Sequence, residues 1–242
     1  MLIINDSYDE EKIKQLLSDC IHNYFSSMTD KLNNLTLSTL MKKNPYLLKI
    51  KGMKSVSELI QSSLSAYISS SEETVFGNVF FEPLAIGVCG GQKALAEGLD
   101  VVIDKGDSIY AIAVKSGPKV FNSDSRKKQE QNFNKASILA KQAKKAFFPI
   151  IGYCYGRKKF RQDSQIQELA GQNFWHAITG DEDFYKKLIY WCDEVKTDYL
   201  KEYDNAYINA LNRLCTEFGQ KFCSSDGAID WAKMAEFSSS AK

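Results

Sequence analysis

Apolar residues recur at the spacing of amphipathic helices over most of this chain. In the range 9–31, for example, Ile13, Leu16 and Cys20 fall on one helical face. The pattern predicts helices at 9–31, 34–43, 55–68, 125–146, 181–200 and 203–222, and a last helix near Trp231. The pair Asn44-Pro45 is expected to end the second of these helices. The chain is therefore predicted to be largely helical.

A further short helix is expected just before the middle of the chain. A serine at 70 or 71 can cap its N-terminus, because a serine hydroxyl accepts a hydrogen bond from a first-turn N–H. Glu72 and Glu73 would follow in the first turn, where the helix dipole favours negative charge. The helix should stop at Pro83, since the residue before a proline disfavours helical backbone angles.

The middle of the chain has a different pattern, which predicts β-strands. The residues at 101–103 are β-branched, as strands prefer. Turn-forming residues at 104–107 separate them from a second apolar run at 109–114, so the two runs form a hairpin. A buried strand is also expected at 147–155. The sheet is therefore predicted to be small and to be surrounded by helices.

The hairpin brings an acid and a lysine together. A turn at 105–108 places Asp100 opposite Ala113, and therefore close to Lys115. A carboxylate can hold a divalent metal ion, and a lysine beside it can assist proton transfer, as metal-dependent phosphodiester hydrolysis requires. The alternative is an ordinary surface hairpin whose Asp and Lys form a weak ion pair.

These residues carry a resemblance to a known family. The hairpin resembles the active-site hairpin of the PD-(D/E)XK nuclease superfamily. The run 114–118, Val-Lys-Ser-Gly-Pro, with the later Asn122 resembles the type II restriction endonucleases in particular. Further resembling stretches lie at 44–49, 69–77, 152–157 and 171–175. The resemblance implies an α/β fold, with a small mixed β-sheet core of the restriction-endonuclease type flanked by many helices.

The sequence departs from the family pattern at one position. The family has an acidic residue two positions before the lysine, and this chain has Ala113 there. Either the chain is an inactive relative or another carboxylate replaces the missing one. Glu82 and Glu73 are the preferred candidates, because superfamily members often carry a helical glutamate in the metal site. Glu82 is favoured over Glu73, because a carboxylate at the C-terminal end of a helix has no capping role.

Length and composition are those of a globular protein. The chain has 242 residues, of which 44% are apolar and 25% are charged. No linker or repeat divides it, so we expect a single nuclease domain over 1–242. It would have a helical N-terminal part at 1–68, a catalytic core at 69–160 and a helical C-terminal part at 161–237. No apolar run reaches membrane-spanning length and no signal peptide is visible, so we expect a cytoplasmic protein without a membrane partner.

The cysteines and histidines exclude one class of site. The six cysteines are scattered singly, and there are only two histidines. A structural zinc site is therefore not expected, and nothing in the sequence indicates an organic cofactor.

Positive charge is concentrated in the middle of the chain, although the net charge is only +1. The basic residues are Lys115, Lys119, Arg126, Lys127, Lys128, Lys135, Lys141, Lys144, Lys145, Arg157, Lys158, Lys159 and Arg161. Local clustering governs the field that a nucleic acid meets, so this segment is compatible with a DNA cleft beside the hairpin. A solvated helix face is the alternative, and it is preferred for Lys141 to Lys145.

The sequence as a whole predicts a Mg²⁺-dependent type II restriction endonuclease that cleaves double-stranded DNA at a specific site. Asp100, Glu82, Glu73 and the backbone carbonyl of Val114 would hold the metal, and Lys115 would act on the attacking water. The predicted DNA contacts are Lys119, Asn122, Ser123, Arg126, Lys127, Gln129 and Arg157. A homodimer is expected, because cutting both strands needs two active sites.

Two alternatives remain open. One is another nuclease of the same fold, such as a nicking, modification-dependent or junction-resolving enzyme. The other is a non-catalytic DNA-binding or interaction module, which Ala113 would explain.

Overall fold

The structure is a computed structural model that describes residues 2–94, 96–158, 164–195 and 198–240. The chain divides into two compact units, each built from two separate segments. Unit 1 comprises Met1–Tyr24 and Phe76–Lys196, and unit 2 comprises Phe25–Val75 and Thr197–Lys242. The expected single nuclease domain, with an N-terminal part, a catalytic core and a C-terminal part in consecutive ranges, stays a prediction.

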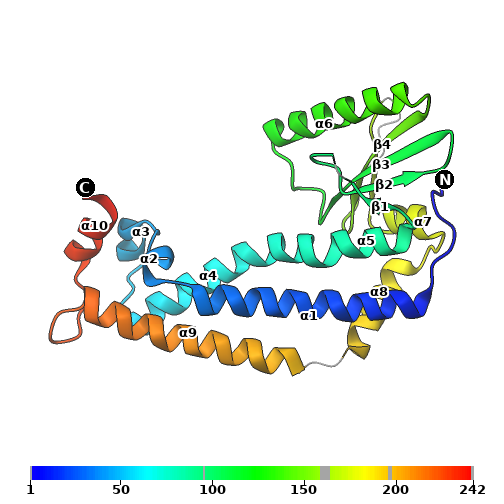
Figure 1. Cartoon of the computed structure of the whole chain (residues 1–242). Helices are drawn as coiled ribbons and strands as arrows, with labels where there is room; N and C mark the ends of the chain where they lie inside the picture. The colour runs from blue at the N-terminus through cyan, green and yellow to red at the C-terminus, as the bar shows by residue number, and fades with distance from the viewer. Residues whose placement is uncertain (1, 95, 159–163, 196–197, 241–242) are drawn as a thin grey trace. The chain divides into compact units, whose positions relative to one another are not determined.

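Helices outnumber strands in the described residues, as the periodicity predicts (Figure 1). The helices are α1 Glu10–Asn34, α2 Leu37–Leu40, α3 Pro45–Ile50, α4 Val56–Phe76, α5 Glu82–Cys89, α6 Ser123–Gln142, α7 Gln172–Thr179, α8 Phe184–Glu194, α9 Asp198–Phe222 and α10 Trp231–Ser239, with a π-helical turn at Gly77–Phe81. The strands are β1 Gln92–Lys93, β2 Val101–Asp104, β3 Ser108–Lys115, β4 Ala146–Tyr153 and β5 Gln167–Ala170.

Unit 1 contains a mixed five-stranded sheet with the order β1-β2-β3-β4-β5. The strands β2 and β3 form the predicted antiparallel hairpin, and Val101 pairs with Ile112. The strands β3, β4 and β5 are parallel, and Lys115 pairs with Tyr153 at their carboxyl ends. The α/β fold with a small mixed sheet and many helices is thus confirmed.

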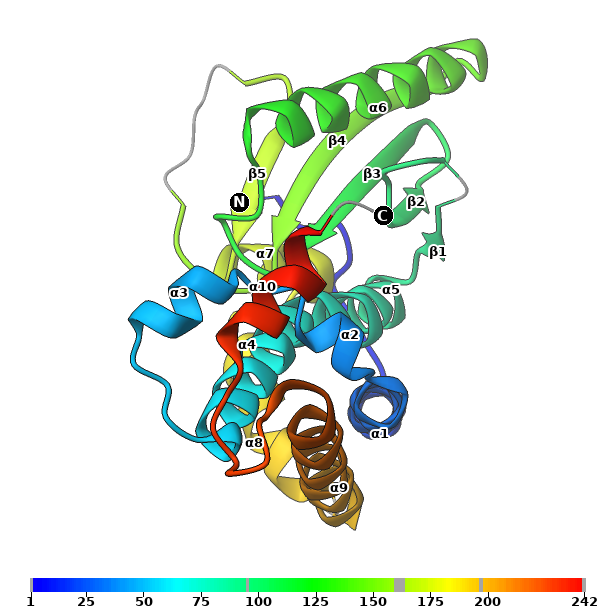
Figure 2. The same cartoon turned by 90° about the vertical axis from the view of Figure 1, so that its left-hand side faces the viewer.

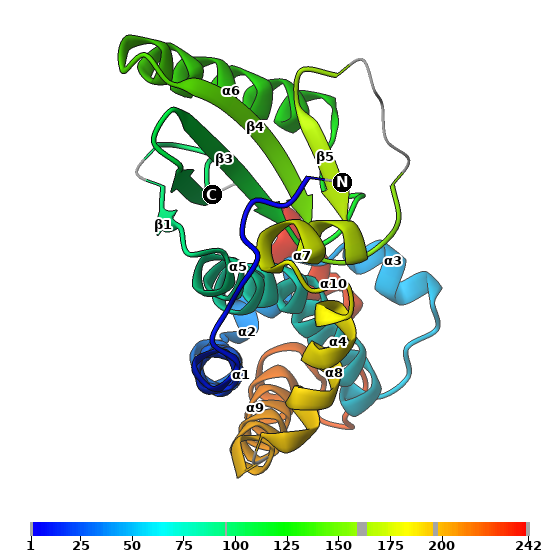
Figure 3. The ribbon, with the colours of Figure 1, turned by 90° about the vertical axis from the view of Figure 1, so that its right-hand side faces the viewer.

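Helices cover both faces of this sheet. The helix α6 packs on one face (Figure 3). There Phe133 belongs to one buried cluster with Ala111 and Ala113 of β3. The helices α5 and α7 pack on the other face against Ile112 and Val114. Both sets of alternating side chains on β3 are therefore buried, which explains why this strand is almost entirely apolar.

The helix before the hairpin neither begins at a serine at 70 or 71 nor stops at Pro83, so both predictions are wrong. A helical path runs from α4 through the π-helical turn Gly77–Phe81 into α5, where Pro83 lies in the first turn. A proline lacks an N–H and clashes with the carbonyl four residues earlier in a regular α-helix. We infer that the π-helical turn just before Pro83 widens the helix and relieves this conflict.

Two short helices and two short strands were not predicted. Asn44-Pro45 does follow a helix, but it also begins α3, because Asn44 caps that helix and Pro45 occupies its first turn. The helix α7 begins at Gln172, within the family-resembling stretch 171–175, for which no helix was predicted. The strands β1 and β5 are too short to produce a periodic signal.

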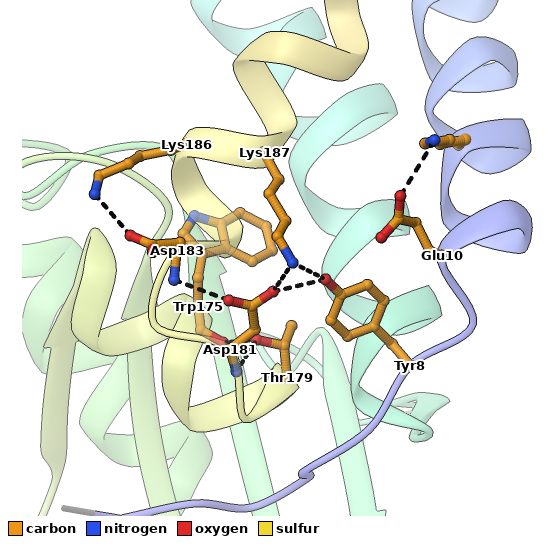
Figure 4. Close-up of polar contacts among 9 residues, drawn as sticks. Tyr8, Glu10, Trp175, Thr179, Asp181, Asp183, Lys186 and Lys187 are labelled. Atoms are coloured by element: carbon orange, nitrogen blue, oxygen red, sulfur yellow. Dashed lines mark hydrogen bonds and ion pairs between the residues drawn. The ribbon is translucent and has the colours of Figure 1, made fainter.

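A polar cluster ties the N-terminal segment of unit 1 to the turn between α7 and α8 (Figure 4). Tyr8 Oη and Lys187 Nζ both donate to Asp181 Oδ2, at 2.7 and 2.6 Å. Thr179 Oγ1 donates to the Trp175 carbonyl and accepts from the Asp181 N–H. The cluster thereby fixes the end of the helix that carries Trp175.

In its described residues unit 2 consists of helices and connecting loops, with one isolated β-bridge between Cys223 and Ile229. The Arg213 guanidinium on α9 donates to the Leu35 and Leu32 carbonyls at 2.8 and 3.1 Å, at the C-terminal end of α1. Such carbonyls have no partner within their own helix, so the arginine acts as a cap. The helix α10 packs beside α3 (Figure 2).

Among the described residues of either unit, no helix is long and apolar enough to cross a membrane.

Candidate active site

Asp100 lies where the β2–β3 hairpin opens at its base. The register that pairs Val101 with Ile112 places Asp100 opposite Ala113, as predicted. The Val114 N–H donates to Asp100 Oδ2 at 2.6 Å, so the carboxylate takes the position of a backbone acceptor. The side chain is only 19% exposed and is therefore fixed in direction.

Lys115 is the last residue of β3 and pairs with this carboxylate. Its Nζ lies 3.3 Å from Asp100 Oδ2, and the lysine side chain is 26% exposed. Within the described part of the chain, both hydrogen bonds to the Asp100 carboxylate use Oδ2. Oδ1 is therefore available for a further ligand. The predicted juxtaposition of Asp100 and Lys115 is confirmed as geometry, while their roles remain a proposal.

Two buried side chains of α6 fix the turn that leads to Asp100. Gln129 Nε2 donates to the Gly98 carbonyl at 2.6 Å. Gly98 has a φ of +75°, and a Cβ at this position would lie 2.2 Å from Asn132 Nδ2. Only glycine fits both the backbone angle and the close approach of Asn132. Gln129 was predicted to contact DNA, but here it is buried and positions the turn before Asp100.

Ala113, the position of the missing family acid, is completely buried. It lies among Leu99, Phe133, Ile151 and Tyr153 under α6. A carboxylate here would lose its hydration in an apolar environment, which is costly without a partner. The methyl group therefore suits its surroundings, and the carboxylate must come from elsewhere if the site needs a second one.

The two helical glutamates have different positions. Glu82 Oε1 lies 3.1 Å from Lys93 Nζ, and Glu82 occupies the first turn of α5. The expectation that it lies at a helix C-terminus is wrong, because the helix continues past Pro83. Glu73 belongs to unit 2, whereas Asp100 belongs to unit 1.

Glu168 on β5 is a charged residue of the site region that the sequence did not reveal. It lies in the same row of the sheet as Ala113, because Ala113 pairs with Ile151 and Ile151 pairs with Glu168. Tyr153 Oη donates to its carboxylate at 2.8 Å, Arg126 Nη2 lies 2.9 Å away, and Lys158 forms an ion pair with it. The stretch 166–170, Ile-Gln-Glu-Leu-Ala, is too short to give a periodic signal, so no local pattern in the sequence identifies it.

The Glu168 cluster holds its carboxylate ionised. Burial alone would raise the pKa of Glu168, but hydrogen bonds from Lys158 and Tyr153 and the charge of Arg126 outweigh it and lower the pKa. Burial raises the pKa of the neighbouring Tyr153, so its hydroxyl stays protonated and can donate to Glu168.

The other predicted DNA contacts are spread over α6 and the loops beside the site. Asn122 caps α6, and its side chain and that of Ser125 satisfy each other's backbone N–H groups. Arg126 is engaged by Glu130 and Glu168. Four residues are exposed and free to meet a ligand: Lys119, Ser123, Lys127 and Arg157. Lys159 and Arg161 of the basic segment lie outside the described residues.

The oxygen atoms at the hairpin suit a hard cation such as Mg²⁺. The N–H and C=O of a strand residue point to the same side, so the bond from Val114 N–H to Asp100 also aims the Val114 carbonyl towards Asp100. Residues 2–94, 96–158, 164–195 and 198–240 contain no cluster of three or more His, Cys, Asp or Glu side chains that could hold a metal. Mg²⁺ commonly needs only one or two carboxylates and completes its shell with water and substrate phosphate. The residues present therefore fit Mg²⁺ in an incomplete site that DNA would complete.

Fold and site together define a nuclease of the PD-(D/E)XK type, with its hairpin, its Asp–Lys pair and its mixed sheet between helices. The family model of the type II restriction endonuclease EcoO109I matches residues 11–198, which is more than half of the chain. The chain belongs to this restriction endonuclease family. Among curated protein sequences, none matches the chain.

Proposed function

We propose that this protein is a Mg²⁺-dependent type II restriction endonuclease that hydrolyses double-stranded DNA at a specific site. The observation that carries the proposal is the Asp100–Lys115 pair, held 3.3 Å apart at the carboxyl end of β3. Family membership supports the reaction class, and the geometry supports these residues as its centre.

Asp100 and the Val114 carbonyl would hold the metal through oxygen atoms. A bound Mg²⁺ lowers the pKa of water and offsets negative charge on the scissile phosphate. Lys115 would orient the attacking water and donate hydrogen bonds to the phosphoryl oxygens as their charge develops. Gln129 and Asn132 would keep Asp100 in place through Gly98. Glu82, which belongs to the same unit as Asp100, is the proposed source of an additional carboxylate.

Phosphate contacts are proposed for the exposed cations Lys119, Lys127 and Arg157, and for Ser123 at the N-terminus of α6, with Asn122 and Arg126 beside them. Such contacts make DNA binding weaken steeply with salt, because each neutralised phosphate releases counterions. An enzyme that acts on DNA must reach it, so the proposed location is the cytoplasm.

A homodimer is proposed because a duplex cut needs two active sites. Unit 2 carries a candidate surface on α3, where Tyr46, Leu47 and Ile50 are all exposed, Ile50 by 82%. Apolar side chains that gather on a surface commonly mark an interface. Ile50→Lys together with Leu47→Asp should convert the dimer to a monomer in light scattering. An unchanged mass would place the interface elsewhere.

Supercoiled plasmid and linear DNA, incubated with Mg²⁺ or with EDTA, provide the test. Discrete fragments in Mg²⁺ and intact DNA in EDTA support the proposal. Nicked circles alone, or cleavage only of methylated, mismatched or branched duplexes, would indicate another nuclease of the same fold.

A second candidate is a DNA-binding protein that does not cleave. Buried Ala113 in place of the family acid favours it. Salt-sensitive binding to duplex DNA without cleavage in either Mg²⁺ or Mn²⁺ would establish this alternative.

A further inference from the structure

A pocket of about 640 Å³ lies in unit 1 beside the carboxyl ends of β4 and β5. Its aromatic lining includes Phe81, Tyr155 and Trp175. This volume is within the range of small-molecule sites, which are about 300–1,000 Å³. The π-helical turn, α7 and α8 form its other walls, and Figure 3 shows α7 at the ends of these two strands.

The wall of this pocket is bonded directly to the candidate active site. The Cys154 N–H donates to the Lys115 carbonyl at 2.8 Å, and the Tyr155 N–H donates to the Ser116 carbonyl at 3.0 Å. The carboxyl ends of the parallel strands β3, β4 and β5 meet at one edge of the sheet. The Asp100–Lys115 pair and the pocket therefore lie at the same edge of the sheet.

The aromatic side chains are firmly held, except at the mouth. Trp175 is buried, and its Nε1 donates to the Cys154 carbonyl at 2.8 Å. The Phe81 ring centroid lies 6.5 Å from that of Trp175 and 6.4 Å from that of Tyr155. Tyr155 is 50% exposed, unlike the other aromatic residues near the strand ends. A fixed aromatic wall with one accessible ring suits a flat, ring-shaped ligand.

Polar groups of two kinds complete the lining. Arg157 brings positive charge, while the Lys158 ammonium is paired with Glu168. The amides of Gln172 and Asn173 lie in the first turn of α7. Amides can both donate and accept, as the edge of a nucleobase requires. Cations beside an aromatic pocket match a base that remains joined to its phosphates.

We propose that this pocket receives a nucleobase turned out of the DNA duplex next to the scissile phosphate. The proposal rests on the proposed nuclease function and adds a base-binding site to it. Tyr155 would stack on the extruded base, Gln172 or Asn173 would bond to its edge, and Arg157 would bind the adjacent phosphate. Turning a base out costs unstacking and unpairing energy, and the cost is least for a mismatched base.

The test uses duplexes that span the mapped cleavage site, with one mismatch moved through successive positions. Affinities are measured in EDTA, so that no cleavage occurs. A mismatch at one position, and at its symmetry-related position, should tighten binding about tenfold, because its base is already unpaired. An abasic site at that position should lose this gain, because it offers no base to the pocket.

The variants Tyr155→Ala and Asn173→Ala should abolish the gain, and Tyr155→Ala should weaken binding of the intact site about tenfold. Tyr190→Ala is the matched control, because Tyr190 is an exposed tyrosine of α8 that does not line the pocket. If one of these two variants misfolds, the other still tests the pocket.

The outcomes separate the two proposals. If intact DNA is bound and cut but no mismatch tightens binding, the pocket proposal is wrong and the nuclease function stands. If free deoxynucleoside monophosphates bind at Tyr155 and mismatches have no effect, the pocket holds a free nucleotide and the proposal is again wrong. If no duplex is bound or cut, the nuclease function itself fails.

Discussion

Asp100 and Glu168 are two carboxylates near the same end of one sheet, and their surroundings differ. Glu168 accepts from Tyr153, Arg126 and Lys158, and its pKa is lowered. Asp100 has one backbone N–H and one lysine, both on Oδ2. The Glu168 carboxylate is fully engaged by groups of the protein, whereas Asp100 keeps one carboxylate oxygen for an external ligand.

The difference suggests a division of roles that we propose for the two carboxylates. A group surrounded by its own cations contributes to stability, because removing one partner leaves the others buried and unpaired. A partly buried carboxylate oxygen without a protein partner lowers the stability of the fold, and its use is to bind a ligand. On this basis we propose that Asp100 serves the reaction and Glu168 serves the structure. The predictions below test that division, beginning with the largest effect.

The largest effect is expected on cleavage. Asp100→Asn removes the metal-binding charge and Lys115→Ala removes the group that assists the water. Each should reduce the cleavage rate about a thousandfold or more, with little change in melting temperature. Single-turnover cleavage of a linear duplex provides the measurement.

The same hairpin offers a matched control for this experiment. Asp104 forms an ion pair with Lys145 at the opposite end of the hairpin. Asp104→Asn and Lys145→Ala should leave cleavage within tenfold of the wild type. Equal losses in both pairs would show that the hairpin, rather than a catalytic pair, was disturbed.

A large effect on stability is expected at the other carboxylate. Glu168→Ala leaves Arg126 and Lys158 without their shared partner, and should lower the free energy of unfolding by about 2–4 kcal/mol. Urea denaturation measures it. Glu130 is the outer partner of Arg126, and the Glu130 side chain is about half exposed. Glu130→Ala should therefore change stability by less than about 0.5 kcal/mol. If the two variants are equally stable, Glu168 has no special structural role.

A smaller effect is expected at Glu82. Its carboxylate must leave Lys93 to reach a metal, so its net contribution to the metal site is modest. Glu82→Gln should lower Mg²⁺-dependent cleavage about tenfold at limiting Mg²⁺ and less at high Mg²⁺. Lys93→Ala should have no such metal dependence. A loss as large as that of Asp100→Asn would make Glu82 a principal ligand.

The smallest effect concerns pH. The pKa of Glu168 is lower in the folded protein than its ordinary value of 4.5. The stability it contributes is therefore present above that value, and is lost as the pH falls through the lower, folded pKa. Glu168→Gln should make unfolding less dependent on pH in this acidic range, measured by urea midpoints. An unchanged slope would mean that other carboxylates, such as Asp181, dominate.

The sequence predicted the hairpin well, because β-branched runs and a Gly-containing turn are local signals. The same local argument placed Asp100 beside Lys115. It failed at Pro83, where a π-helical turn lets the helix continue, and at β5, whose four residues are too short for a pattern. The Glu168 cluster depends on parallel strands and a helix far apart in the chain, so no local pattern could reveal it.

Direct measurement of metal binding tests the central claim. Binding of Mn²⁺ to the complex with duplex DNA is measured by electron paramagnetic resonance, with DNA alone subtracted, for the wild type, Asp100→Asn and Glu168→Gln. We expect Asp100→Asn to weaken the affinity about tenfold or more, and Glu168→Gln to bind Mn²⁺ like the wild type. Unchanged affinity in Asp100→Asn, or loss of the metal in Glu168→Gln, would contradict that claim.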